Sequence, residues 1–204
     1  MLRSDERAKI EQYINQTSDI IFNEAKRCIK NGISNQQVID KVINITINRF
    51  APVSKSVMYS AYNTMTEHTL ARQIFQSSQN KAVFYEKDIL KDLNSKFLFD
   101  VPKHINYEES KIVINKWIAS GAVVVVGGII SVPTKSIIPV GIAVMIAGVM
   151  LFVLNNKKSR SEQDIYKLIQ EYLQEVTKTM MEWLNTIETY YDERVEELER
   201  ELVK

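Results

Sequence analysis

The residues that could carry out chemistry in this sequence are two histidines, His68 and His104, and one cysteine, Cys28. Neither histidine has a metal-binding companion three or four residues away, and the neighbouring Glu67 points to a different side of a helix from His68. We interpret both histidines as surface or packing residues. We interpret Cys28 as a small apolar residue on a helix face, since a lone cysteine forms neither an intramolecular disulfide nor a multi-cysteine metal site.

Motifs that would give these residues a catalytic role are missing from the sequence. No glycine-rich phosphate loop, Walker motif, nucleophile elbow or paired-cysteine motif is present. The Arg-x4-His spacing of ribonucleases is also absent, because residue 63 is Asn and residue 99 is Phe. We therefore expect no enzymatic activity, and we predict no cofactor and no metal.

The overall charge gives no reason to bind a polyanion. The chain has 26 Lys and Arg against 25 Asp and Glu, a net charge of +1, so electrostatics favour neither nucleic acid nor an anionic membrane surface. Aromatic residues near basic ones, such as Tyr59 and Phe84, have the helical spacing of core and boundary residues. No nucleic-acid partner is predicted, and any membrane interaction must depend on apolar residues.

The central run "WIASGAVVVVGGIISVPTKSIIPVGIAVMIAGVMLFVL", residues 117–154, contains one charged residue, Lys135. The turn at residues 133–136 divides it into arms of 16 and 18 residues. A hydrocarbon core of ~30 Å requires about 20 apolar residues in a helix, with about 17 as the lower limit. The second arm meets this limit, and the first does so if it extends back through residues 112–115 while Lys116 reaches the headgroups.

We predict that residues 111–156 form a membrane hairpin of two helices. Neither arm keeps the polar stripe of a surface helix, and Trp117 stands at the interfacial position that its ring favours. Basic residues outnumber those of the turn on both flanks, and the first residues resemble no secretory signal, so both termini are expected in the cytoplasm. The residues predicted to contact lipid are Trp117, Val123, Val124, Val125, Val126, Ile129, Ile130, Ile137, Ile138, Ile142, Val144, Met145, Ile146, Val149, Met150, Leu151, Phe152 and Leu154.

The alternative is a chain that stays soluble until triggered, with the apolar hairpin buried inside a helical bundle. The layout, an apolar hairpin of about forty residues within an all-helical chain of about two hundred, resembles that of helical pore-forming toxins, including the pore domain of colicins. The resemblance implies a hairpin that is packed inside an amphipathic bundle and later released into a bilayer. It concerns the layout alone, since no motif of these toxins is present.

Residues 1–110 are predicted to form a helical region in the cytoplasm. A first helix carries apolar residues at every third or fourth position from Ile10 and ends at Asn31 and Gly32. Ser34 and Gln37 have the spacing of a capping box and open a second helix, which Pro52 is expected to end. A third helical pattern runs from near residue 54 to about residue 99, with a break or kink expected within residues 76–81.

Residues 157–204 are predicted to contain a long amphipathic helix of the coiled-coil type. Apolar residues recur three or four apart from residue 165 to residue 202, over about five heptads with one stutter. Such a helix needs a partner, which is either the N-terminal helices or another copy of itself. The residues predicted to mediate oligomerisation are Ile165, Ile169, Tyr172, Val176, Met180, Trp183, Ile187, Tyr191, Val195, Leu198 and Leu202.

The sequence thus predicts an all-α fold in which long amphipathic helices flank a central apolar hairpin of the transmembrane type. A single hairpin encloses no water path, so a channel requires several copies. We expect an oligomeric membrane protein whose partners are the lipid bilayer and further copies of itself, and which forms a pore or perturbs the bilayer. The alternatives are a membrane-anchored helical scaffold that recruits a cytoplasmic partner, and a soluble pore-forming toxin that inserts its hairpin on triggering.

Overall fold

The computed structural model describes residues 1–97 and 162–203, and every regular element in them is a helix. The all-α class is thereby confirmed for this part of the chain. In chain order the elements are α1 (Ser4–Lys30), α2 (Asn35–Leu70), the 3-10 helix η1 (Gln73–Phe75), α3 (Ser78–Glu86), α4 (Ile89–Phe97) and α8 (Glu162–Leu202).

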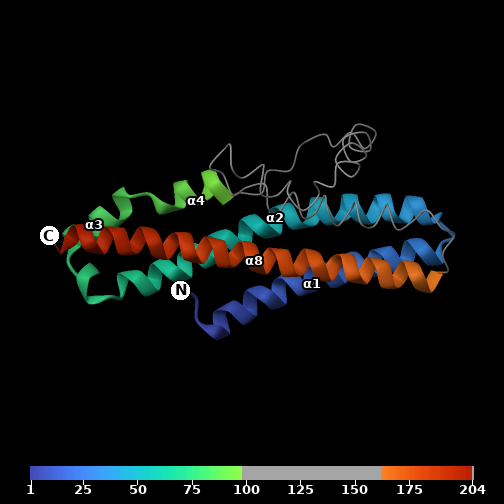
Figure 1. Cartoon of the computed structure of the whole chain (residues 1–204), viewed down its shortest axis with the longest axis horizontal. Helices are drawn as coiled ribbons and strands as arrows, with labels where there is room; N and C mark the ends of the chain where they lie inside the picture. Colours follow the sequence, from blue (N-terminus) through green and yellow to red (C-terminus); the bar gives the residue numbers. More distant parts are fainter. Residues whose placement is uncertain (98–161, 204) are drawn as a thin grey trace, which may run out of the picture.

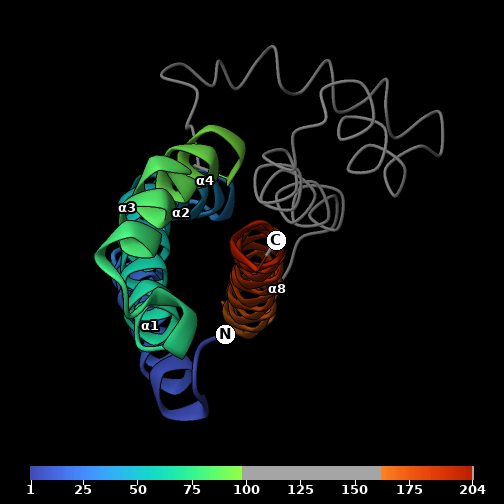
Figure 2. The same ribbon diagram turned by 90° about the vertical axis from the view of Figure 1, so that its left-hand side faces the viewer.

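Three long helices make the body of the molecule. α1 and α2 form an antiparallel pair, and α8 runs alongside both in the direction of α2 (Figure 1). α3 and α4 lie beside the half of α8 that ends at the C-terminus, and α4 packs on α8. Seen along the bundle, α1 to α4 form one layer and α8 lies beside it (Figure 2). Every described element thus depends on α8, directly or through a neighbour, for the cover of its apolar face.

The turn between α1 and α2 follows the local sequence signals. Asn31 ends α1, and Gly32 has a φ of +71°, a left-handed conformation that a residue without Cβ adopts at little cost. Ser34 is the N-cap of α2, and its Oγ accepts the Gln37 backbone N–H at 3.5 Å. The predicted end of the first helix and start of the second are both confirmed.

The prediction that Pro52 ends the second helix is wrong, because α2 continues through it for 36 residues in all. Proline removes one backbone hydrogen bond and costs a helix interior ~3 kcal/mol. Pro52 itself faces solvent, whereas Phe50, Val53 and Val57 around it are buried. Burying side chains of this size yields roughly 1.5–3 kcal/mol each, so packing on both sides of the proline outweighs its local cost.

The long third helix expected from the sequence is divided into shorter ones. The expected break occurs, although it begins earlier, where α2 stops at Leu70 and η1 precedes α3. Ser77 then caps α3 by accepting the Asn80 N–H at 3.1 Å. A second break, which the sequence did not predict, separates α3 from α4 at Asp88, whose φ is 43°.

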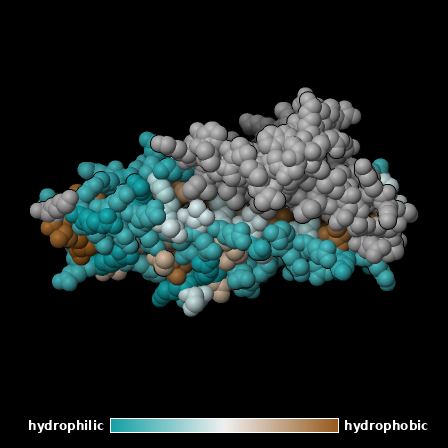
Figure 3. Space-filling view, in the orientation of Figure 1, coloured by the Kyte–Doolittle hydropathy of each residue, from teal (hydrophilic) through white to brown (hydrophobic). Residues whose placement is uncertain are grey.

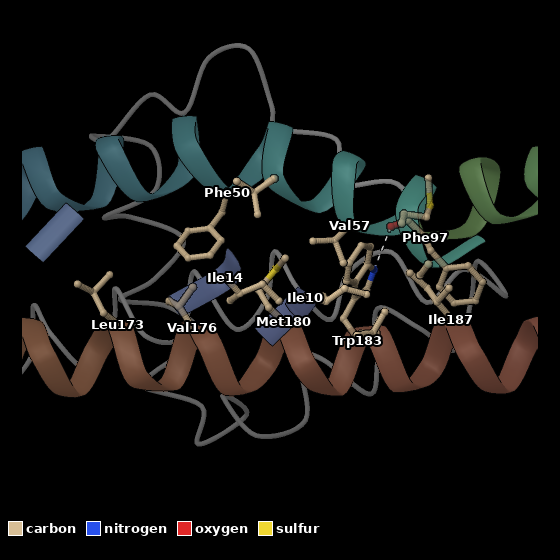
Figure 4. Packing of buried hydrophobic residues seen from close by; sticks show 14 of the residues in the cluster. Ile10, Ile14, Phe50, Val57, Phe97, Leu173, Val176, Met180, Trp183 and Ile187 are labelled. Carbon is tan, nitrogen blue, oxygen red and sulfur yellow. Dashed lines mark hydrogen bonds between the residues drawn. The ribbon is translucent and has the colours of Figure 1, made fainter. Parts of the chain in front are cut away.

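The apolar faces of the helices meet in one continuous core. Ile10 and Ile14 of α1 and Phe50 of α2 face α8 between Leu173 and Ile187 (Figure 4). The described surface is dominated by hydrophilic residues (Figure 3). The described residues therefore separate apolar from polar side chains as an amphipathic bundle does.

Candidate functional site

The apolar stripe of α8 is the surface on which the rest of the described bundle assembles. Ten of the eleven residues predicted to mediate oligomerisation are buried, namely Ile165, Ile169, Tyr172, Val176, Met180, Trp183, Ile187, Tyr191, Val195 and Leu198, and Leu202 is partly buried. α8 packs on α1, α2 and α4 of its own chain. Of the two partners considered for this helix, the N-terminal helices are therefore the one observed, while association between copies stays a prediction.

Buried polar contacts fix the position of α8 along its neighbours. The Tyr191 hydroxyl is hydrogen-bonded to the hydroxyls of Thr69, at 3.1 Å, and Thr66, at 3.3 Å, on α2. The Ser18 and Thr177 hydroxyls pair at 2.9 Å between α1 and α8. Such pairs form only in one register, because a shift of the helix would leave buried polar atoms without partners.

Tyr172 adds a further polar group to the α2 side of the core. Its side chain is buried, and burial raises the pKa of its hydroxyl to about 12, while a hydrogen bond with Thr46 acts in the lowering direction. An apolar environment disfavours the phenolate. Tyr172 consequently remains a neutral hydrogen-bonding group at neutral pH.

The α4 clasp, formed by Asp92, Lys96 and Phe97 of α4 with Trp183 and Tyr190 of α8, holds α4 in place. Trp183 Nε1 donates to the Phe97 carbonyl at 3.1 Å, a buried bond that satisfies an acceptor at the end of α4. The Tyr190 hydroxyl accepts from Lys96 Nζ at 2.6 Å and donates to Asp92 Oδ2 at 3.1 Å. The Phe97 and Tyr190 rings pack edge to face at 5.3 Å between centroids.

A second polar cluster joins the start of the chain to α8. Glu188 has a side chain only 7% exposed. Its carboxylate accepts the Leu2 backbone N–H at 2.9 Å and Arg7 Nη1 at 2.6 Å. Arg7 also donates to Asn185 on the next turn of α8. The buried charge is thus both paired and hydrogen-bonded, which is the condition for keeping a carboxylate inside a protein.

His68 belongs to a neighbouring ion-pair cluster. Its Nε2 lies 3.1 Å from Glu6 Oε1, and its Nδ1 lies 3.3 Å from the Met1 carbonyl oxygen. Arg3 donates twice to the same Glu6 oxygen, at 2.6 and 2.9 Å. The hydrogen bond from Arg3 is the main cause that lowers the pKa of Glu6 to about 2. These contacts link α1 to the end of α2, whereas His104 lies outside the described residues.

The described residues offer little for catalysis. Within residues 1–97 and 162–203 no group of three or more His, Cys, Asp or Glu side chains could hold a metal ion, and Cys28 is buried. A groove of about 450 Å³ opens between the start of α1 and the second half of α2, lined by both charges and by hydroxyls such as Ser56 and Ser60. Its lining includes neither histidine nor cysteine, so these serines have no basic partner there.

The predicted membrane hairpin, residues 111–156 with its lipid-contacting side chains, lies outside the described residues. Among the helices that the structure does describe, none has the length and apolar character needed to cross a bilayer. The predictions for the hairpin therefore rest on its sequence.

Sequence reasoning named Trp183 as an apolar contact and Tyr190 as a coiled-coil packing residue. It did not find that both hold α4, nor that Glu188 is a buried charge. A tyrosine or glutamate beside an apolar stripe carries no signal for the distant side chain that it meets.

No protein-family model, curated protein or solved structure matches this chain.

Proposed function

We propose that this protein acts on lipid bilayers, with an amphipathic helical bundle carrying the apolar hairpin of residues 111–156 into the membrane, where several copies form a pore or perturb the bilayer. One observation carries the proposal. The described residues build a continuous hydrophobic core of their own, and between them the sequence holds 38 residues, 117–154, with a single charge. Apolar segments of this length that are not needed for a core are typical of membrane insertion.

The attachment of the apolar segment supports this proposal. Phe97 is held at the level of Trp183, and the described chain resumes at Glu162, 21 residues before Trp183 on the same helix. At ~1.5 Å per residue these two points lie about 30 Å apart along α8. Residues 98–161 are therefore an insertion between two elements that are each anchored in the bundle. Such an insertion can enter a membrane while both anchors stay packed.

The alternative, a membrane-anchored scaffold, is favoured by a different observation. The stripe predicted for assembly is already buried within one chain, and two helices alone enclose no channel. A hairpin that only anchors the bundle needs no assembly. In this case the hydrophilic face of the bundle (Figure 3) would recruit a protein partner.

Membrane fractionation with a carbonate wash tests insertion. We expect the full chain to stay in the washed pellet, and Val125→Arg or Ala143→Arg to shift it to the supernatant, because a charge at a helix centre costs ~2.5–3.5 kcal/mol of insertion free energy. Tyr85→Arg is the matched control, since Tyr85 is exposed on α3 outside the apolar run. Equal retention of all variants would reject a spanning hairpin.

Dye release from lipid vesicles then separates the two functions. A pore-forming or perturbing protein releases a trapped dye, and the release should be lost with Val125→Arg. A scaffold binds the vesicles without release. Binding without release by the full chain would therefore reject the pore in favour of the anchor.

A further inference from the structure

The covering of the α8 stripe is shared unequally between three elements. α1 has 27 residues, α2 has 36 and α4 has 9. α4 contributes three buried side chains, Ile89, Leu93 and Phe97, each four residues from the next. A helix of this length is unstable by itself in water, so α4 depends on the α4 clasp for its structure and is the element whose removal disturbs the bundle least.

The link before α4 allows it to move as a unit. Asp88, between α3 and α4, has a φ of 43°, a conformation in which a residue with a side chain is less stable than in the helical region. Its carboxylate accepts the Lys91 N–H at 3.2 Å, which marks the first turn of α4. A change at this one residue reorients α4 without altering α3.

The face under α4 has the properties of a helix-pairing surface. Trp183, Ile187 and Tyr190 recur at positions i, i+4 and i+7 of α8, the spacing of a coiled-coil seam. Trp183 and Ile187 are buried, and Phe97 lies against this part of α8 (Figure 4). When α4 leaves, these apolar side chains face water, and the same face on a second chain is their natural complement around a two-fold axis.

We propose that α4 is a removable cover over an assembly surface, so that undocking of the α4 clasp exposes Trp183, Ile187 and Tyr190 to a second copy of this chain. The inference rests on the proposed function, because a pore requires several copies. It resolves the conflict between a stripe suited to assembly and a stripe buried within the chain. A second copy is the partner that the heptad spacing of the face selects.

Adjacent tyrosines of α8 provide a matched pair of variants for the test. Tyr190→Phe removes the hydroxyl that binds Asp92 and Lys96 of α4, and Tyr191→Phe removes the hydroxyl that binds Thr66 and Thr69 of α2. The chemical change is the same, and only the element released differs. Leu93→Ala weakens α4 while leaving α8 unaltered, so it covers the case in which Tyr190 itself contributes to the contact between copies.

Hydrogen exchange of the full chain measures the opening of α4. Tyr190→Phe and Leu93→Ala should raise exchange in residues 89–97 roughly tenfold, the equivalent of losing one or two buried contacts. Tyr191→Phe should leave this segment unchanged. Unchanged exchange in 89–97 with both α4 variants would overturn the role of the clasp.

Disulfide trapping measures the association of copies. In a Cys28→Ala background, a cysteine introduced by Thr186→Cys lies between Trp183 and Tyr190 in sequence and is half-exposed on α8. Tyr190→Phe and Leu93→Ala should increase the disulfide-linked dimer several-fold, and Tyr191→Phe should not. An increase in exchange without an increase in dimer would overturn the inference, as would an equal dimer yield with Tyr191→Phe.

The same proteins distinguish this inference from the proposed function. More dimer with no dye release from vesicles of phosphatidylcholine and phosphatidylglycerol would support the cover and reject the bilayer activity. Dye release by every protein, with no change in dimer, would support the bilayer activity and reject the cover.

Discussion

At the scale of single residues, the polar side chains of α8 are placed where each one has a specific partner. Trp183 meets a helix-end carbonyl, Tyr191 meets two threonines and Glu188 meets an arginine and a backbone N–H. Apolar contacts alone would tolerate sliding between helices, whereas a buried group that loses its partner costs ~1–3 kcal/mol. These residues therefore select one register for a helix that could otherwise pack in several.

Glu188 allows this to be tested with a single substitution. Glu188→Ala should lower the free energy of unfolding by ~2–3 kcal/mol, because Arg7 and the Leu2 N–H lose a buried charged acceptor. Glu197→Ala on the same helix is the control. Glu197 pairs with Arg194 at 2.9 Å and is 49% exposed, so its loss should cost less than ~1 kcal/mol. Urea denaturation measures both, and equal destabilisation would contradict a special role for Glu188.

At the scale of elements, α2 shows how packing overrides a local signal. Pro52 has no N–H to donate to the carbonyl of Asn48, one turn earlier, yet the helix continues because its neighbours are buried on the core side. The proline is thus a local cost that tertiary contacts offset.

Pro52→Ala should consequently stabilise the protein by ~1–2 kcal/mol, because it restores a backbone hydrogen bond to Asn48 and removes no buried side chain. Thermal unfolding measures the gain. Ser56→Ala, also exposed on α2, controls for helix propensity alone and should give a few tenths of a kcal/mol. A loss of stability with Pro52→Ala would mean that the bundle requires the geometry that proline imposes.

The boundaries of elements were predictable where a residue acts through its own backbone. Gly32 and Ser34 mark the first turn because a left-handed conformation and an N-cap are local properties. The break at Asp88 was not predictable, since an aspartate with positive φ looks like any other aspartate in sequence. The periodicity of α8 predicted which of its residues are buried, but a period contains no information on whether the cover comes from the same chain or another.

At the scale of the whole molecule, the described bundle carries its core without the apolar run. Replacing residues 111–156 with a Gly/Ser linker of equal length should therefore leave a cooperatively folded helical protein. The linker easily spans the distance of about 30 Å between the levels of Phe97 and Glu162 along α8.

Circular dichroism and the fluorescence of Trp183 would measure this outcome. The replacement removes Trp117, so Trp183 remains as the one tryptophan and reports on the α4 clasp. A native-like buried emission is expected, and Leu93→Ala in the shortened protein should shift it toward that of exposed tryptophan. Loss of cooperative unfolding after the replacement would mean that the apolar run belongs to the core.

The separation of α4 from its partners along the chain has a consequence for the newly made protein. Phe97 and Trp183 are 86 residues apart, so at roughly 5–20 residues per second the ribosome completes α4 and the apolar run several seconds before Trp183 emerges. During this interval neither α4 nor the faces of α1 and α2 that α8 later buries have their cover. Vectorial synthesis therefore gives a membrane or a chaperone access to the apolar run before the bundle can close.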